Sequence, residues 1–289
     1  MKFSMTGKQV AALLVVAAGL CGAVWGCGSR PAPAPGAEVT KAAAPVEAPI
    51  PTLAEEVAKY KGQKPKQWGE QVDGVLTRVP TQEKVIFLTF DACGGPYGSG
   101  YDQKLLDFLN KEKVEATLLL NSRWLEANPE LAKQLAANPL FSLQNHGTQH
   151  RPLCVNGRSV YKIQGTRSVA EVYEEIMGTD ARLKQLTGKR PRFFRSGTAY
   201  YDEVAVKVAR DLGYTITGFD ILGDAGATYS KAQIIKVARA ARPGTIIIYH
   251  MNQPRSATSA GVPEVVKNLR AAGYEFKKLE DYWPVQARS

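Results

Sequence analysis

The three histidines of the chain all lie at or just after the end of an apolar run. His146 and His150 follow the run FSLQN, and His250 ends the run TIIIYH. A spacing of four residues puts two imidazoles on one side of a helical turn, and imidazole nitrogens are common ligands of divalent metals. Such a pair also arises by chance on protein surfaces, so its place directly after an apolar run is what favours a metal site.

Asp91 and Arg195 occupy comparable places. Asp91 ends the run VIFLTF, and Arg195 lies inside FFRSG. Asp91 suits a metal ligand, a general base or a helix N-cap, but the glycines and the proline in CGGPYG disfavour a helix directly after it. An arginine inside a strand needs a partner, and we expect it to pair with Asp91. That pair lowers the pKa of the aspartate and keeps it ionised, as a base requires.

Apolar, β-branched runs alternate with segments of helical periodicity along the chain. The alternation predicts an α/β fold with a parallel sheet covered by helices. Polar residues at the ends of several runs favour a barrel or near-barrel over an open sheet, because these ends converge on one face of a barrel. The predicted strands are 85–90, 116–120, 141–146, 193–197, 215–220, 245–250 and 275–279.

The N-terminal segment is typical of an export signal, with two lysines, an apolar core and small residues. Its end is similar to a bacterial lipobox, so we predict a lipoprotein-type signal peptide over 1–26 and acylation of Cys27. Cleavage at a nearby site or an uncleaved anchor are the alternatives. Residues 27–55 are rich in Pro and Ala and predict an extended tether. Residues 56–289 fit one domain with a single core.

The chain carries a net charge of +10, of which the two lysines of the signal account for two, leaving 10 − 2 = +8. A basic exported protein suits an anionic wall polymer or an anionic lipid surface. Its basic residues are scattered singly without interleaved aromatic residues, so we expect no nucleic-acid partner. Two of the four cysteines lie in or beside the signal, which leaves Cys93 and Cys154 as a candidate pair in an oxidising compartment.

Five motifs, in this order, resemble those of the polysaccharide deacetylases, the NodB-like group that includes chitin and peptidoglycan deacetylases. They are TFDACGG, HGTQH, FFRSGTAYYD, GFDILGDAG and IIIYH, and the resemblance covers about residues 84–282. It implies a distorted (β/α)7 barrel-like single domain that uses a divalent metal, most often zinc.

The resemblance also implies a role for each matched residue. Asp91 corresponds to the catalytic base, and Arg195 to the arginine that orients it. His146 and His150 correspond to the two metal-binding histidines, and His250 to the general acid.

The loops after the strands match the family less closely. Thr198 lies where the family supplies a backbone N–H to the oxyanion. Gly147 replaces the usual Ser or Thr between the histidines, and prolines after the arginine are replaced as well. The fourth motif lacks its tryptophan, so Asp220 and Asp224 both remain candidates for its acidic residue.

The main departure from the family lies beside the expected base. The family's third metal ligand, an aspartate, corresponds to Ala92, which cannot coordinate a metal. The third ligand is then Asp91, another group, or none, in which case the metal is lost. Cys93 is a candidate replacement. We favour instead a disulfide between Cys93 and Cys154, because the compartment is oxidising.

Together these features predict a metal-dependent hydrolase that removes N-acetyl groups from an amino-sugar polysaccharide such as peptidoglycan, a chitin-like polymer or an exopolysaccharide. We expect it in the bacterial cell envelope, anchored to a membrane by lipid on Cys27. Two alternatives remain open at this point. One is a hydrolase of a small non-sugar amide, and the other is a metal-poor sugar-binding pseudoenzyme.

Overall fold

The computed structural model describes residues 49–282, which fall within one compact unit. The predicted signal peptide at 1–26, the predicted acylation site Cys27 and most of the tether predicted at 27–55 lie outside the described residues. Within residues 49–282, none of the helices is both long enough and apolar enough to cross a membrane.

The main sheet of the described domain has nine strands, and all of its pairings are parallel. All seven predicted strands are present. The order along the sheet is β1-β8-β7-β4-β3-β2-β10-β9, and β11 pairs with β2. The strands are β1 (Val75–Leu76), β2 (Val85–Ala92), β3 (Ala116–Leu120), β4 (Phe141–Asn145), β7 (Phe193–Phe194), β8 (Thr215–Thr217), β9 (Ile221–Leu222), β10 (Ile246–His250) and β11 (Glu275–Phe276).

The sheet is curled and forms a distorted half-barrel. The segment between β8 and β9 lies on its open side. β8 pairs with β7, whereas β9 begins four residues after the end of β8 and pairs with β10. Between these strands, the backbone N–H of Asp220 donates to the carbonyl of Ile246 at 2.9 Å. This short segment therefore leads from β8, which lies next to the edge strand β1, to β9 at the other edge of the sheet.

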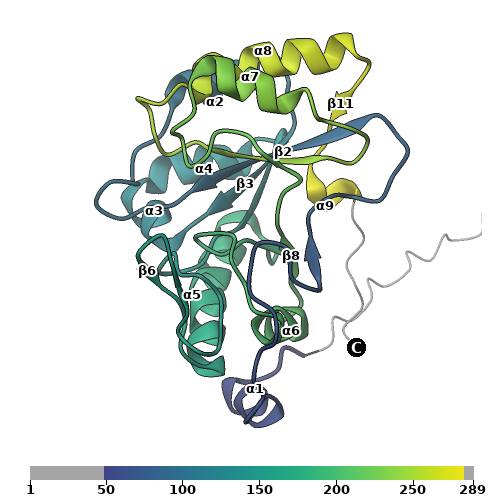
Figure 1. Ribbon diagram of the computed structural model, residues 1–289. Coiled ribbons are helices and arrows are strands. Elements are labelled where there is room, and N and C mark those ends of the chain that lie inside the picture. The colour runs from purple at the N-terminus through teal and green to yellow at the C-terminus, as the bar shows by residue number, and fades with distance from the viewer. Residues whose placement is uncertain (1–48, 283–289) are drawn as a thin grey trace, which may run out of the picture. The chain divides into compact units, whose positions relative to one another are not determined.

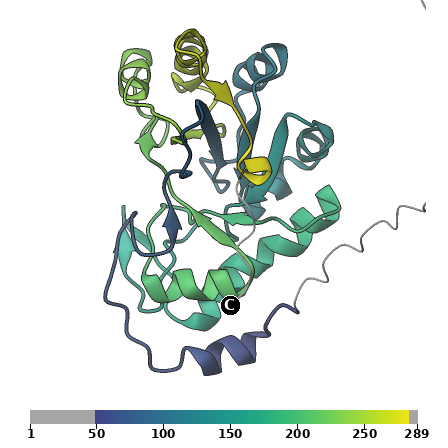
Figure 2. The same cartoon turned by 90° about the vertical axis from the view of Figure 1, so that its right-hand side faces the viewer.

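Helices cover the outside of the curled sheet (Figures 1 and 2). The segment after β3 divides into two helices at Asn128, because Pro129 disfavours helical backbone in the residue before it. The helices are α1 (Leu53–Lys59), α2 (Gln103–Lys111), α3 (Ser122–Ala127), α4 (Pro129–Ala137), α5 (Val169–Thr187), α6 (Glu203–Asp211), α7 (Lys231–Ala238), α8 (Thr258–Ala271) and α9 (Leu279–Tyr282).

Strand β2 is buried along its whole length, which explains why its sequence is almost continuously apolar. Side chains alternate between the two faces of a strand. One face enters the apolar core that also includes residues of α2 and α8, through Ile86, Leu88, Phe90 and Ala92. The other face points into the barrel, where Phe87 belongs to a second buried cluster together with Ile246 and Phe193.

Helix α1 (Leu53–Lys59) spans residue 56, where we predicted that the domain starts. The helix begins at Leu53, and its N-cap Thr52 forms a capping box with Glu55. Tyr60, just after the helix, is buried in the core and donates a hydrogen bond to Asp211 of α6. Ordered structure therefore begins before residue 56, within the segment predicted as tether.

Candidate active site

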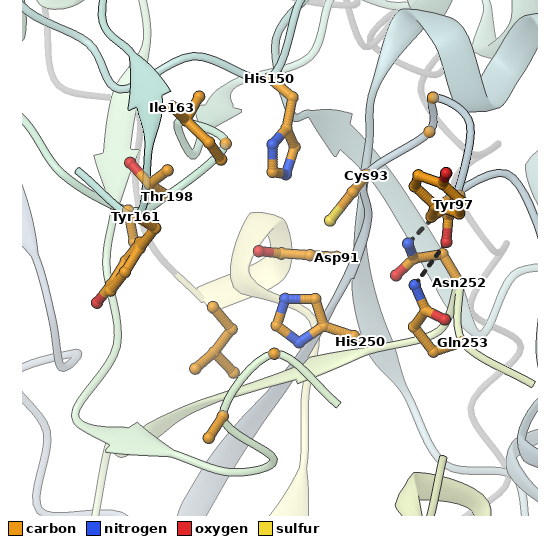
Figure 3. A pocket seen from close by; sticks show the side chains of 18 of the residues that line it. Asp91, Cys93, Tyr97, His150, Tyr161, Ile163, Thr198, His250, Asn252 and Gln253 are labelled. Carbon is orange, nitrogen blue, oxygen red and sulfur yellow. Dashed lines mark hydrogen bonds between the residues drawn. The ribbon is translucent and has the colours of Figure 1, made fainter. Parts of the chain in front are cut away.

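A pocket of about 620 Å³ opens at the C-terminal ends of the strands. Its lining includes Asp91 at the end of β2, His250 at the end of β10, and the loops that follow β2, β4, β7 and β9. Figure 3 shows Asp91 at its centre, between His150, Cys93 and His250. The structure thus brings together side chains that are more than 150 residues apart in the sequence.

Asp91 and Arg195 form the expected ion pair. The Arg195 guanidinium donates from Nη1 to Asp91 Oδ1 at 2.7 Å, and Arg195 is fully buried. Its other nitrogens donate to the carbonyls of Thr217 at 3.2 Å and Gly218 at 2.7 Å, so three contacts fix the guanidinium in one orientation. Such a network compensates the cost of burying both charges.

The carboxylate of Asp91 is held in its ionised form. Burial by itself disfavours the charge, but the Arg195 guanidinium lies close enough to outweigh it and lowers the pKa of Asp91. Oδ2, the oxygen that Arg195 leaves free, lies 3.7 Å from His146 Nε2. An ionised, largely water-excluded carboxylate with one free oxygen is suited to accept a proton.

His146 and His150 lie side by side, with ring centroids 5.0 Å apart and ring planes at 85°. The imidazole of His146 is buried, and its Nδ1 lies 2.9 Å from the Arg195 carbonyl oxygen. As a donor to that oxygen, Nδ1 carries the proton, which leaves a lone pair on Nε2. Nε2 of His150 is buried and has no hydrogen-bond partner among the described residues. Both histidines therefore offer a nitrogen that suits a metal ion.

Glu175 of α5 holds the loop that carries His150. Its buried carboxylate accepts hydrogen bonds from the backbone N–H groups of Gln149 and Arg151, on either side of the histidine. This support matters because His150 itself has a φ of 62°, in the left-handed region that side chains rarely adopt. The carboxylate also explains the glycine at position 147, where a Cβ would lie 2.4 Å from Glu175 Oε1.

We expect Gly147→Ala to destabilise the protein more than Gly188→Ala. The two glycines have nearly equal φ values of 77° and 76°, so both variants incur the same left-handed backbone cost of about 1–2 kcal/mol. A Cβ added at Gly147 would clash with the Glu175 carboxylate, whereas a Cβ at Gly188 meets no atom within 4 Å. Denaturant unfolding should show an excess of about 1–3 kcal/mol for Gly147→Ala, as expected for overpacking. Equal losses would contradict the role of Glu175.

His250 is paired with Asp224, one of the two candidate aspartates of the fourth motif. Asp224 is fully buried and accepts from His250 Nδ1 at 2.8 Å and from the His250 backbone N–H at 2.7 Å. Thr258 donates to the same carboxylate at 2.9 Å. Asp220 instead lies away from the pocket lining and contacts Thr245 and Arg242.

The pKa of His250 follows from this pairing. Burial disfavours the charged imidazolium, but the Asp224 carboxylate beside it raises the pKa of His250 well above its usual value. With Nδ1 directed at Asp224, the Nε2 side of the ring is left for the pocket. His250 is therefore placed to donate a proton there.

Thr198 lies in the pocket wall, in the turn after β7. Its side-chain Oγ1 is buried and has no hydrogen-bond partner among residues 49–282. The turn is held from both sides, because Gly197 donates to the Arg151 carbonyl and Ala199 donates to the Ser196 carbonyl. The predicted oxyanion contact of Thr198 remains an expectation.

The predicted disulfide between Cys93 and Cys154 is not formed, and both cysteines are free. Cys154 is buried, and its Sγ lies 3.0 Å from the carbonyl oxygen of Thr166. Cys93 lines the pocket, with Sγ 3.8 Å from His146 Nε2. The expected oxidising compartment favoured the bridge, but the chain after His150 turns Cys154 into the core instead.

Two residues of this site were missed by reasoning from the sequence. Glu175 had a detectable signal, because it occupies the buried stripe of α5 between Val172 and Ile176, where an acid is unexpected. The contact of Thr258 with Asp224 had none, because a threonine at the start of a helix has many uses.

The chain matches known proteins over most of its length. The family model described as Polysaccharide deacetylase matches residues 78–217. The peptidoglycan-N-acetylmuramic acid deacetylase PdaA of Bacillus subtilis is 24% identical, over 75% of this chain and 80% of that protein. A peptidoglycan-N-acetylglucosamine deacetylase of Bacillus cereus is 27% identical, over 72% of this chain and 92% of the relative. The comparisons support the assignment of this chain to the polysaccharide deacetylase family.

Solved structures associated with this family show the same fold. That of Bacillus subtilis PdaA, a family 4 carbohydrate esterase, has a TM-score of 0.56 at 23% identity, and the match covers 80% of this chain and 88% of that one. A family 4 pseudoenzyme from Bacillus anthracis has a TM-score of 0.59 at 22% identity, covering 71% and 67% of the two chains. These likenesses confirm the predicted barrel-like α/β fold.

Proposed function

We propose that this protein is a metal-dependent hydrolase that removes N-acetyl groups from an amino-sugar polysaccharide. The observation that carries the proposal is the meeting of two oppositely tuned groups in one pocket. Asp91 is held ionised by Arg195, and His250 is held protonated by Asp224. Hydrolysis of an amide needs this combination of a base and an acid.

The base and the acid act at different atoms. Asp91 accepts a proton from the water that attacks the amide carbon, and Arg195 keeps its carboxylate ionised and oriented for that step. His250 then gives its proton to the departing amine nitrogen, because an amide nitrogen must be protonated before it can leave. Thr198 offers its backbone N–H to the oxygen that becomes negative.

The donor atoms of the pocket fit a divalent ion. His146 and His150 would hold it, since the first has its proton fixed on Nδ1 and the second has a buried, unpartnered Nε2. Two imidazoles suit zinc, which when bound supplies a Lewis acid for the amide carbonyl.

Aromatic side chains at the mouth of the pocket suit a sugar polymer. Tyr97 and Tyr161 lie on opposite sides of Asp91 (Figure 3) and are 93% and 67% exposed. Tyr161 lies between β5 (Ser159–Val160) and β6 (Ile163–Gln164), and its ring is 5.7 Å from that of Tyr200. Exposed tyrosines of this kind can stack on pyranose rings.

We expect Asp224→Asn to shift the pH dependence of the reaction. Loss of the carboxylate lowers the pKa of His250, so the acid is deprotonated at lower pH than in the wild type. The alkaline limb of the kcat/KM profile, which reports the acid of the free enzyme, should therefore move to lower pH. Asp220→Asn is the matched control and should leave the limb in place. An unmoved limb in Asp224→Asn would contradict the assignment of His250 as acid.

Mass spectrometry of the products tests the substrate class. Purified protein is incubated with peptidoglycan fragments, chitooligosaccharides and a small acetamide. The proposal predicts loss of acetyl groups from at least one of the two polymers and little reaction with the small amide. Reaction with the small amide alone would favour the second candidate substrate class. Binding of sugar without any acetyl loss would instead identify a pseudoenzyme.

We also propose that the protein acts in the bacterial cell envelope, held there by lipid on Cys27. The support is the signal-like composition of residues 1–26 and the substrates named for the two peptidoglycan deacetylases above. Mass analysis of the exported protein tests it, because an acylated Cys27 predicts a diacyl or triacyl mass increment. An unmodified N-terminus would contradict the anchor.

A further inference from the structure

The end of β2 points Ala92 and Cys93 to different sides. Ala92 is fully buried in the apolar core, together with Leu120 and Trp124. Cys93 follows on the opposite side, where it lines the pocket together with Asp91. The alternation of side chains along a strand accounts for this difference. A ligand supplied from this segment beside Asp91 is therefore placed at position 93, not at position 92.

The Cys93 sulfur and the two histidines form one compact donor cluster. Within the described residues, the candidate ligand atoms of Cys93, His146 and His150 all lie within 4.8 Å of one another. Cys93 Sγ and His146 Nε2 are 3.8 Å apart. A tetrahedral zinc ion, with bonds of about 2.3 Å to sulfur and about 2.0 Å to nitrogen, would put these atoms about 3.5 Å apart. The cluster is thus within a few tenths of an ångström of a coordinating geometry at this pair.

Neighbouring groups leave all three donor atoms available to one metal ion. The Arg195 carbonyl fixes the proton of His146 on Nδ1, and Glu175 braces the loop of His150. Nε2 of His150 is buried without a hydrogen-bond partner among the described residues, and a metal ion bound in the cluster would be its partner. Cys93 is a free cysteine, so no disulfide withdraws its sulfur from the cluster.

We propose that Cys93 is the third protein ligand of the metal ion, completing a Cys-His-His site with His146 and His150. The inference deepens the proposed function and rests on it for the ion's place in catalysis. Three protein ligands leave a fourth position open, as catalytic zinc sites require. Asp91 is then free of the metal and remains the base.

A thiolate in the site changes which metals it prefers. Thiolate with imidazole favours zinc and cobalt, whereas carboxylate and carbonyl oxygens suit magnesium, calcium and manganese. The protein should therefore retain zinc or cobalt in the presence of excess magnesium.

Cobalt substitution tests the ligand without substrate. The purified full chain is stripped of metal and titrated with Co²⁺, and its near-ultraviolet absorption is recorded. The wild type should bind one equivalent and develop a thiolate-to-cobalt charge-transfer band. Cys93→Ser should lose the band and bind cobalt at least about tenfold more weakly. Loss of a residue that merely supports a metal ligand already weakens metal binding about tenfold or more, so loss of a ligand should cost at least as much. Cys93→Asp should recover binding without the band, which shows that the site still folds.

Cys154→Ser is the matched control, because it removes the other thiol of the described domain and should keep the band. A band that survives in Cys93→Ser, or a wild type that binds cobalt without a band or binds none, would overturn the proposal. Failure of the proposed function is distinguishable, because it would appear as a charge-transfer band in a protein that releases no acetate.

Discussion

Asp91→Asn is expected to reduce acetate release by at least about 100-fold, since a positioned acid or base contributes about 10²–10⁴-fold to such reactions. The asparagine keeps the shape of the side chain but cannot accept the proton of the attacking water. Its amide also faces the guanidinium of Arg195, from which Asp91 Oδ1 now accepts at 2.7 Å. The variant should therefore lose kcat more than substrate binding.

The control for this variant is Asp107→Asn, at an exposed position on α2 where, among residues 49–282, the carboxylate accepts only from Gln103. It should hydrolyse the substrate at the wild-type rate. Circular dichroism of both variants checks that they are folded, and binding of a chitooligosaccharide checks that the pocket is intact. Acetate release by folded Asp91→Asn within threefold of the wild type would refute the assignment of the base.

Arg195→Leu is expected to lower the free energy of unfolding by about 3–5 kcal/mol, the cost of breaking a buried ion pair by removing one partner. The carboxylate of Asp91, 3% exposed, would remain in the barrel without its compensating charge. The carbonyls of Thr217 and Gly218 would lose their donor as well. Denaturant unfolding at neutral pH measures this loss.

Arg242→Leu provides the comparison, because Arg242 also pairs with an aspartate but is 60% exposed. Exposed pairs contribute less than about 1 kcal/mol, so this variant should be close to the wild type in stability. The double variant Asp91→Asn/Arg195→Leu should be more stable than Arg195→Leu alone, because it leaves no uncompensated charge. A double variant no more stable than Arg195→Leu would contradict the electrostatic explanation.

The strands could be predicted from the sequence because burial on both faces of a parallel sheet demands continuous apolar runs. The meeting of Asp91, Arg195 and His250 could be predicted as well, because each lies at or near a strand end and the C-terminal ends of the strands converge on one face of a barrel. The start of the domain could not be located, because the Pro/Ala-rich composition runs on close to the first turn of α1. Composition indicates flexibility but does not reveal a capping box.

The surroundings of the metal-binding residues were less accessible to prediction. Whether Ala92 or Cys93 faces the pocket depends on the pleat at the end of β2, and one residue of register exchanges the two faces. The partner of Cys154 depends on how the loop after His150 folds back, which local sequence does not specify. Asp224 and Asp220 are equally acidic, and only the tertiary position of β9 brings Asp224 to His250.

The central claim is that this pocket is a metal-dependent deacetylase centre, and acetate release before and after metal removal tests it most directly. Purified protein is assayed on peptidoglycan and on chitooligosaccharide, then dialysed against a chelator and assayed again with and without added zinc. We predict that acetate release from at least one polymer falls to the background rate on chelation and returns with zinc. Acetate release that is unaffected by the chelator, or its absence from both polymers with metal bound, would contradict the claim.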